Sequence, residues 1–207
     1  MQQRGLGIVL ATVILAALVP AREIRAASHQ SESHPQAQES GRSQVHLPLA
    51  DFSLTDQTGR PFRFQELRGK VVLVTFIYTT CSDVCPLLTS RMVLVQRDLK
   101  GTERSSVYLL GITTDPEIDR PQILKSYAGR YGVDFSNWSF LTGSPGELAP
   151  VWKSFRVQVQ RKARGLVNHT PLTALLDKAG IMRFAYFGTS PDHRSMLRDL
   201  RSLLPSS

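Results

Sequence analysis

Two cysteines, Cys81 and Cys85, are the only cysteines among the 207 residues, so any chemistry at sulfur must use this pair. Pro86 follows directly, and proline is common in the first turn of a helix, so the pair is predicted to lie where a strand turns into a helix. Free backbone N–H groups and the positive end of the helix dipole favour a thiolate over a thiol there. Both cysteines are therefore expected to be more acidic than a free cysteine.

The spacing of the two cysteines bears on the kind of sulfur chemistry. Disulfide exchange usually uses two cysteines separated by two residues, whereas these are separated by three, which suits two ligands on one metal ion. Polar neighbours at Ser82 and Asp83 argue against two cysteines that merely pack in a core. Two thiolates cannot form a four-cysteine zinc site, but a thiol-disulfide oxidoreductase remains an open alternative.

A candidate third donor, His169, lies 84 residues after Cys85, in a predicted loop before a strand that starts near Leu172. In an open α/β sheet such a loop faces the strand-to-helix turn, which would bring the imidazole towards the two sulfur atoms. Two thiolates and one imidazole suit copper, holding Cu(I) in a three-coordinate site and leaving room for Cu(II).

The elements that must position these donors follow from the apolar pattern. Residues 71–78 are a continuous apolar run, typical of a central strand buried on both faces. Residues 86–100 carry one apolar stripe at helical spacing and stop at Gly101. A second buried strand, 106–113, and a helix around 123–131 follow, so the two strands are predicted to pair in parallel through a right-handed crossover.

The second half predicts a short strand at 138–141, a helix over 148–155, a hairpin of 172–176 with 182–187, and a closing helix over 196–204. A further hairpin surrounds the turn at 56–59 and precedes the first core strand. Together these elements predict an α/β, thioredoxin-like fold for residues 47–207, with a central mixed sheet flanked by helices and an N-terminal hairpin extension.

The N-terminal segment predicts export. One basic residue, Arg4, precedes an uncharged apolar run at 6–19, so residues 1–27 are read as an export signal or an N-terminal membrane anchor. Residues 28–46 are poor in aliphatic and aromatic side chains and predict a flexible linker. The folded part is therefore expected in the bacterial periplasm, either soluble or anchored to the inner membrane.

The charge balance is basic, with 25 Lys and Arg against 17 Asp and Glu and a formal net charge of +8. The basic residues are scattered and are not interleaved with stacking aromatics, which excludes a nucleic-acid partner from the expected functions. The densest basic cluster, Arg161, Lys162 and Arg164, lies just before His169 and is taken as a hypothetical docking site for an acidic rim on a copper donor or recipient.

Over roughly residues 48–190 the sequence resembles the SCO/SenC family of copper-handling proteins that serve cytochrome c oxidase assembly. The resemblance is carried by an ordered series of motifs: Phe52-Ser53-Leu54, Leu67-Arg68-Gly69-Lys70, the strand 71–78 with the two-cysteine turn, Thr114-Asp115-Pro116-Glu117-Ile118-Asp119, Leu141-Thr142-Gly143, and His169-Thr170. It implies a thioredoxin-like, exported, usually membrane-anchored domain that binds copper through Cys81, Cys85 and His169. Asp83 and Asp115 are then candidate neighbours of the metal site.

Three positions depart from the usual family pattern: Ser82 replaces a proline, Asn168 replaces an acidic residue, and Ala174 replaces a frequent tyrosine. None of these changes removes a donor atom. The departures concern the redox behaviour of the turn and the identity of the client.

The expected function is a copper metallochaperone that accepts copper from a donor protein and delivers it to the copper-binding subunit of cytochrome c oxidase. The alternative is a periplasmic thiol-disulfide oxidoreductase in which Cys81 and Cys85 are the catalytic pair, working with a thiol reductant on client cysteines, or a redox or copper sensor. A peroxiredoxin is disfavoured because Val74 stands where its proline would be required.

Overall fold

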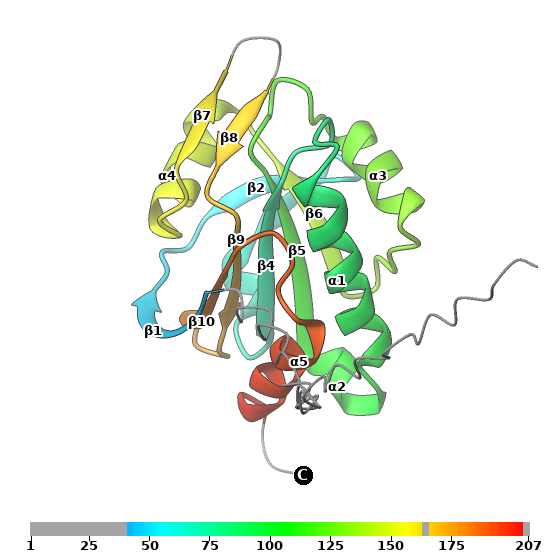
Figure 1. The fold of residues 1–207 in the computed structure, drawn as a ribbon, viewed down its shortest axis with the longest axis vertical. Coiled ribbons are helices and arrows are strands. Elements are labelled where there is room, and N and C mark those ends of the chain that lie inside the picture. The colour runs from blue at the N-terminus through cyan, green and yellow to red at the C-terminus, as the bar shows by residue number, and fades with distance from the viewer. Residues whose placement is uncertain (1–40, 163–165, 205–207) are drawn as a thin grey trace, which may run out of the picture. The chain divides into compact units, whose positions relative to one another are not determined.

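The computed structural model describes residues 41–162 and 166–204. Within these residues one large sheet has the strand order β1-β10-β9-β4-β5-β6-β2-β3, and β7 and β8 pair as a separate antiparallel hairpin (Figure 1). The strands are β1 (Arg42–Pro48), β2 (Ser53–Asp56), β3 (Pro61–Arg63), β4 (Val71–Ile77), β5 (Val107–Thr113), β6 (Trp138–Thr142), β7 (Val159–Arg161), β8 (Val167–His169), β9 (Leu172–Leu176) and β10 (Ile181–Phe187).

The central strand β4 explains why the sheet is mixed. It pairs in parallel with β5 and antiparallel with β9, and all seven of its residues are buried. A strand covered on both faces needs apolar side chains in both directions, which is what the uninterrupted run at 71–77 supplies. The predicted parallel pair, the β2–β3 hairpin and the β9–β10 hairpin are all confirmed.

Helices cover both faces of this sheet. On one face, a core cluster joins Met92, Tyr127 and Met196 from three helices to alternate residues of β4. On the other, Phe155 and Phe64 belong to a second cluster. The predicted α/β, thioredoxin-like fold with a mixed sheet flanked by helices is therefore confirmed. The helices are α1 (Val84–Asp98), α2 (Gly101–Ser106), α3 (Pro121–Arg130), α4 (Pro145–Ser154), α5 (His193–Ser202) and the 3-10 helix η1 (Phe64–Leu67).

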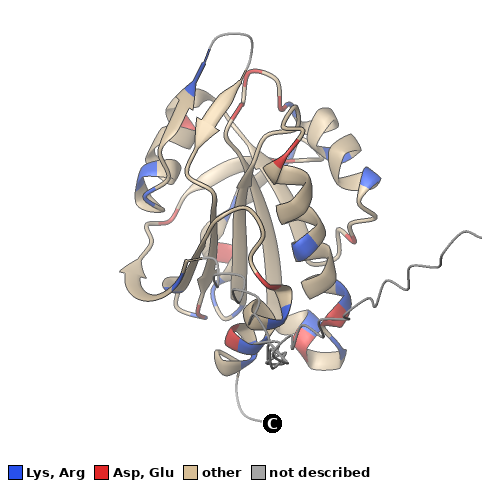
Figure 2. Ribbon diagram, viewed as in Figure 1, with Lys and Arg blue, Asp and Glu red and all other residues tan. Residues whose placement is uncertain are grey.

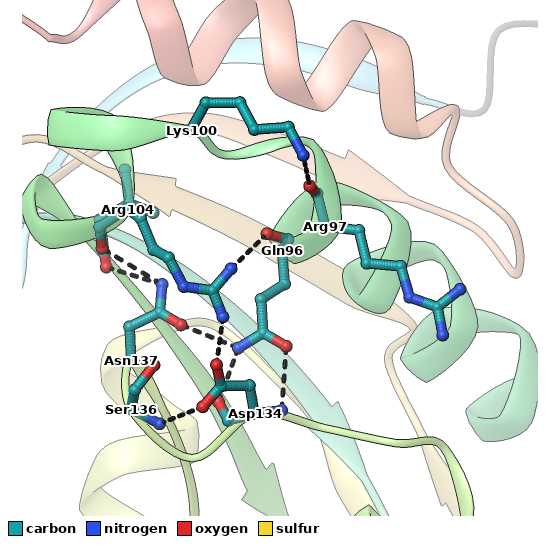
Figure 3. Close-up of polar contacts among 8 residues, drawn as sticks. Gln96, Arg97, Lys100, Arg104, Asp134, Ser136 and Asn137 are labelled. Carbon is teal, nitrogen blue, oxygen red and sulfur yellow. Dashed lines mark hydrogen bonds and ion pairs between the residues drawn. The ribbon is translucent and has the colours of Figure 1, made fainter.

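A polar cluster fixes the C-terminal end of α1, the helix that carries Cys85 at its other end (Figure 3). The amide nitrogen of Gln96 donates to the carbonyl of Asp134 at 2.7 Å and to Oδ1 of Asn137 at 2.8 Å. Arg104, on α2, forms an ion pair with Asp134. These bonds tie α1 and α2 to the turn before β6. They hold the C-terminal end of α1 at the end of the strands opposite to the cysteines.

Several predicted boundaries are wrong. The linker was expected to reach residue 46, but β1 starts at Arg42 and pairs with β10. The pairing is supported by the Asp199 carboxylate, which accepts hydrogen bonds from the Arg42 guanidinium and from the Tyr186 hydroxyl. Residues 101–106 form a helix, so β5 starts at Val107, one residue later than predicted. The predictions for residues 1–27 and 28–40 lie outside the described residues. No helix in the described part is long and apolar enough to cross a membrane.

Candidate metal and thiol site

The two cysteines lie where the sequence predicted, between the end of β4 and the first turn of α1. The backbone N–H of Cys81 donates to the carbonyl of Tyr78 at 3.2 Å, which closes the turn after the strand. Cys85 is the second residue of α1 and is fully buried, whereas Cys81 is partly exposed. Cys81 is therefore accessible from the surface, whereas Cys85 is enclosed in the hydrophobic core.

The two sulfur groups share hydrogen bonds, and this separates their acidities. The Cys85 thiol and the backbone N–H of Cys85, 3.4 Å from Cys81 Sγ, both donate to Cys81. The Cys85 thiol is the main cause that lowers the pKa of Cys81 to about 5; burial opposes it, and the Asp83 N–H and the Tyr78 hydroxyl add to the lowering. At neutral pH Cys81 is therefore a thiolate.

The pKa of Cys85 moves in the opposite direction, first because its thiol donates to Cys81 and second because it is buried. The prediction that both cysteines are acidic is thus wrong for Cys85. A helix N-terminus can stabilise one negative charge here, but two adjacent thiolates would repel each other in a buried site. The pair holds one proton between its two sulfur atoms.

Asp119 positions the turn that carries the cysteines. Its fully buried carboxylate accepts the Thr79 N–H at 3.1 and 3.2 Å, and it also accepts the hydroxyls of Thr79 and Thr113, the latter at 2.5 Å. Burial is the main cause that raises the pKa of Asp119, while the threonine hydrogen bonds oppose it. The carboxylate thus fixes the chain two residues before Cys81 to the loop after β5.

His169 was predicted in a loop but is the last residue of β8. Its Nδ1 lies 3.0 Å from the carbonyl oxygen of Thr170, which can only accept, so Nδ1 carries the proton. Burial is the main cause that lowers the pKa of His169, so the ring is neutral at pH 7. A neutral ring protonated on Nδ1 has its lone pair on Nε2, the atom that would bind a metal.

Tyr78 links His169 to the sulfur pair. Its ring meets the imidazole edge to face, with 5.9 Å between ring centroids. Burial is the main cause that raises the pKa of Tyr78 to about 12, and the negative charge of Cys81 adds to it. The phenol therefore stays protonated and donates towards the Cys81 thiolate.

The three predicted donors are not yet within bonding distance of one ion. Cys81 and Cys85 are in direct contact, and the Cys81 charge acts on His169 and opposes the lowering of its pKa. Among residues 41–162 and 166–204, however, no three His, Cys, Asp or Glu side chains are grouped closely enough to hold a metal. The structure brings together two donors and places the third nearby, beside Tyr78.

The two acidic candidates have other partners. Asp83 is exposed, and what it contributes is its backbone N–H towards Cys81. Asp115 is buried, and its Oδ1 accepts from Arg161 at 2.7 Å, while Oδ2 has no hydrogen-bond partner. Arg161 also contacts Glu117 at 2.7 Å, so the end of β7 lies against the acidic loop after β5 (Figure 2).

Sequence reasoning missed the roles of Tyr78 and Asp119 and the whole β7–β8 hairpin. The hairpin left one signal, the alternation Val157-Gln158-Val159-Gln160, which is typical of a strand with one exposed face. Asp119 belongs to a motif already noted for its resemblance, but its burial against Thr79 depends on tertiary structure. The Arg164 of the proposed basic cluster lies outside the described residues.

The family model described as SCO1/SenC matches residues 40–205, which is more than half of the chain. The chain belongs to the SCO1/SenC family. A protein of Bacillus subtilis named SCO1 protein homolog is 36% identical over 127 residues, covering 58% of this chain and 65% of that protein. The match to this Bacillus relative thus spans slightly less than two thirds of its length.

Solved structures of this family share the fold. The Bradyrhizobium japonicum protein ScoI, solved with copper bound, is 31% identical with a TM-score of 0.65, and the match covers 76% of this chain and 99% of that chain. A protein called BsSco, described by a disulfide switch and as a member of the Sco family of cytochrome c oxidase assembly proteins, is 30% identical with a TM-score of 0.68; the match covers 78% and 95% of the two chains.

Proposed function

We propose that this SCO1/SenC domain binds copper through Cys81, Cys85 and His169 and delivers it to a copper centre of cytochrome c oxidase during its assembly. The observation that carries the proposal is the state of the donors. Cys81 is a thiolate at neutral pH, and the neutral imidazole of His169 has its Nδ1 proton on the Thr170 carbonyl, so its Nε2 lone pair is available. Thiolate and imidazole nitrogen are the donors that copper prefers among protein groups.

Copper is cargo in this proposal, so the site must release the ion as well as bind it. Cys85 must lose its proton to become a second ligand, and its raised pKa means that binding releases a proton and tightens as pH rises. His169 stands apart from the sulfur pair, beside Tyr78. In such a donor set His169 can bind and release the ion separately from the two cysteines, which suits stepwise transfer of copper to a second protein.

The partners and location follow from the same proposal. A copper donor protein, the copper-binding subunit of cytochrome c oxidase and a thiol reductant are the partners. The periplasm is the location, with the apolar run at 6–19 serving as export signal or membrane anchor. Support for copper comes from the copper-bound Bradyrhizobium relative, and support for oxidase assembly comes from BsSco, which is described as a member of a family of cytochrome c oxidase assembly proteins.

The experiment is metal analysis of the reduced 207-residue chain after exposure to Cu(I). Wild type is expected to retain about one copper ion per chain, and His169→Ala is expected to lose tight binding. His193→Ala is the matched control, because His193 is also partly buried but lies at the start of α5. Equal copper in wild type and His169→Ala, or none in wild type, would overturn the proposed ligand set.

A second candidate function, thiol-disulfide exchange, is favoured by the contact between Cys81 and Cys85 and by the low pKa of Cys81. The Cys81 thiolate would attack a client disulfide, and Cys85 would then attack the mixed disulfide. The client gains two electrons and two protons: the Cys81 thiolate and the Cys85 thiol supply both electrons and one proton, and water supplies the other proton. The resulting Cys81–Cys85 disulfide is then reduced back to the thiolate and thiol by the thiol reductant. His169→Ala should spare this exchange, whereas Cys81→Ser should abolish both exchange and copper binding.

A further inference from the structure

A cavity of about 290 Å³ lies on the face of the sheet that does not carry the cysteines. Its floor is formed by Phe155, Leu172, Met182 and Ala185, which are all buried and belong to the second core cluster. Cys85 belongs to the first cluster, on the other face. In Figure 1 the elements around the cavity, β1, β10 and the end of α4, lie on the left of the view. The cavity is therefore separate from the candidate metal site.

A β-bulge in β1 brings three consecutive residues to this cavity. The register of pairing with β10 shifts between Gln44 and Leu47, so Val45 and His46 together lie opposite one residue of β10. In a regular strand successive side chains point to opposite faces, so three neighbours would not line one cavity. Val45, His46 and Leu47 all line it, because the bulge breaks the alternation. The bulge thus adds an exposed imidazole to an otherwise apolar stretch of the lining.

A second irregularity brings a guanidinium to the same cavity. At the end of α4 the Arg156 N–H donates to the carbonyl of Lys153 at 3.0 Å. The Val157 N–H donates to the carbonyl of Trp152 at 2.8 Å, which completes a Schellman turn. This turn needs a residue with a left-handed backbone, usually glycine, and here that residue is Arg156 with a φ of 58°. The chain thus keeps an arginine at a position that favours glycine, and this arginine lines the cavity.

The lining combines an apolar floor with two basic side chains, Arg156 and His46, and contains no acidic residue. Within residues 41–162 and 166–204 neither basic side chain forms an ion pair. A guanidinium binds a carboxylate through two parallel N–H donors, and the apolar floor favours a ligand whose other atoms are apolar. Phe187, which is 43% exposed at the end of β10, adds apolar surface to the same cavity. The lining therefore fits an anion with an apolar body.

We propose that this cavity binds a small monocarboxylate with an aliphatic body, the chemistry of a medium-chain fatty acid. The carboxylate accepts hydrogen bonds from the Arg156 guanidinium and from the His46 ring, and the aliphatic chain covers the side chains of Leu172 and Met182. No covalent bond forms or breaks, so the ligand binds reversibly. The inference goes beyond the proposed copper function and does not depend on it.

The size of the cavity sets the length of the ligand. A water molecule occupies about 30 Å³ in the liquid and a methylene group is of similar size, so a cavity of about 290 Å³ admits about ten non-hydrogen atoms. Octanoate is of about this size. The shorter butanoate would leave part of the floor uncovered, whereas the uncharged octanol would leave Arg156 without a charge partner. These three probes therefore separate the apolar contribution to binding from the ionic one.

The test uses the methionine methyl groups of the 207-residue chain as reporters in NMR spectra. Met182 lies in the cavity floor, whereas Met92 and Met196 belong to the core cluster on the other face and serve as internal controls. Octanoate is expected to shift the Met182 signal saturably, with a Kd of about 0.1 mM for a ligand of about ten non-hydrogen atoms. The Met92 and Met196 signals should not move, and butanoate and octanol should bind at least about tenfold more weakly.

Variants at Arg156 separate ligand binding from folding. Arg156→Gly removes the cation without straining the backbone, because glycine readily adopts a positive φ. The affinity for octanoate should fall about tenfold, while the thermal midpoint should stay the same or rise. Arg156→Lys keeps the charge but loses the two parallel donors, so its affinity should fall about threefold. Arg120→Gln is the matched control and should bind as wild type, because Arg120 is also exposed but precedes α3, whose buried side chains belong to the first cluster.

Four results would each overturn the inference. The first three are the absence of a saturable Met182 shift up to about 5 mM octanoate, an affinity for octanol equal to that for octanoate, and an unchanged affinity in Arg156→Gly. The fourth is an equal movement of the Met182, Met92 and Met196 signals, because it would show binding that is not confined to the cavity.

Discussion

The ion pair between Arg161 and Asp115 fastens the hairpin that carries His169 to the rest of the domain, and its removal gives a quantitative test. Asp115 is 1% exposed, and its Oδ1 lies 2.7 Å from the Arg161 guanidinium. Arg161→Ala leaves a buried carboxylate without its partner. Removing one member of a fully buried pair costs 3–5 kcal/mol, but the Arg161 side chain is partly exposed, so we expect a loss of about 1–3 kcal/mol in the free energy of unfolding.

The loss should depend on pH in a defined direction. Burial is the main cause that raises the pKa of Asp115, and the Arg161 charge opposes this rise. Without Arg161 the pKa rises further, so the folded state favours the protonated carboxyl more strongly. The cost of Arg161→Ala is therefore full when the pH is well above this pKa and shrinks as the pH falls through it.

The measurement is urea unfolding at pH 7.5 and pH 4.5 of wild type, Arg161→Ala, Asp115→Asn and the double variant. The double variant should be about as stable as Asp115→Asn, which gives a coupling free energy of about 1 kcal/mol or more at pH 7.5. Arg183→Ala is the control, because the ion pair of Arg183 with Asp177 is longer, at 3.3 Å, and more exposed. A loss for Arg161→Ala that is equal at both pH values, or no coupling, would refute the reasoning.

Three further predictions test the turn and the sheet. The rate at which iodoacetamide alkylates Cys81 in the reduced, metal-free chain, measured by mass spectrometry, should rise with pH with a midpoint near pH 5. A midpoint above about pH 8 would contradict the assigned thiolate. Asp119→Asn should lower the free energy of unfolding by about 2–4 kcal/mol in urea titrations, since the buried carboxylate accepts several hydrogen bonds that the amide cannot all replace; a loss under about 0.5 kcal/mol would contradict this. Gly111→Ala should lower the thermal midpoint through a loss of about 1–3 kcal/mol, because the added Cβ would lie 2.7 Å from the Phe140 ring, whereas Gly129→Ala, with open space in α3, should leave it unchanged or raise it.

The fold could be predicted largely because its centre is encoded locally. The run at 71–78 is apolar in both directions and the stripe in 86–100 has helical period, so the strand, the helix and the turn between them follow from periodicity alone. By contrast β1 is polar along most of its length and was assigned to the linker. It is a strand because it pairs with β10 and because Arg42 binds Asp199, and both partners are distant in the sequence.

The candidate site was predicted in its residue types but not in its electrostatics. The spacing of Cys81 and Cys85 places both at the helix entrance, yet no sequence pattern states that one sulfur would be buried and keep the proton. The role of Asp119 was equally hidden, because its carboxylate reaches Thr79 across 40 residues of sequence. Burial and long-range hydrogen bonds are properties of the folded chain, and these decide the protonation states.

The placement of β4 between β5 and β9 has a consequence for biosynthesis. One edge of β4 is paired as soon as β5 exists, but the other edge waits for β9, which is made almost a hundred residues later. Until β9 has been made, a nascent or truncated chain exposes the unpaired edge of the apolar strand β4, which can act as a template for aggregation. β9, the strand that covers this edge, begins three residues after His169. The chain is therefore protected from aggregation through β4 only once all three proposed copper donors have been synthesised.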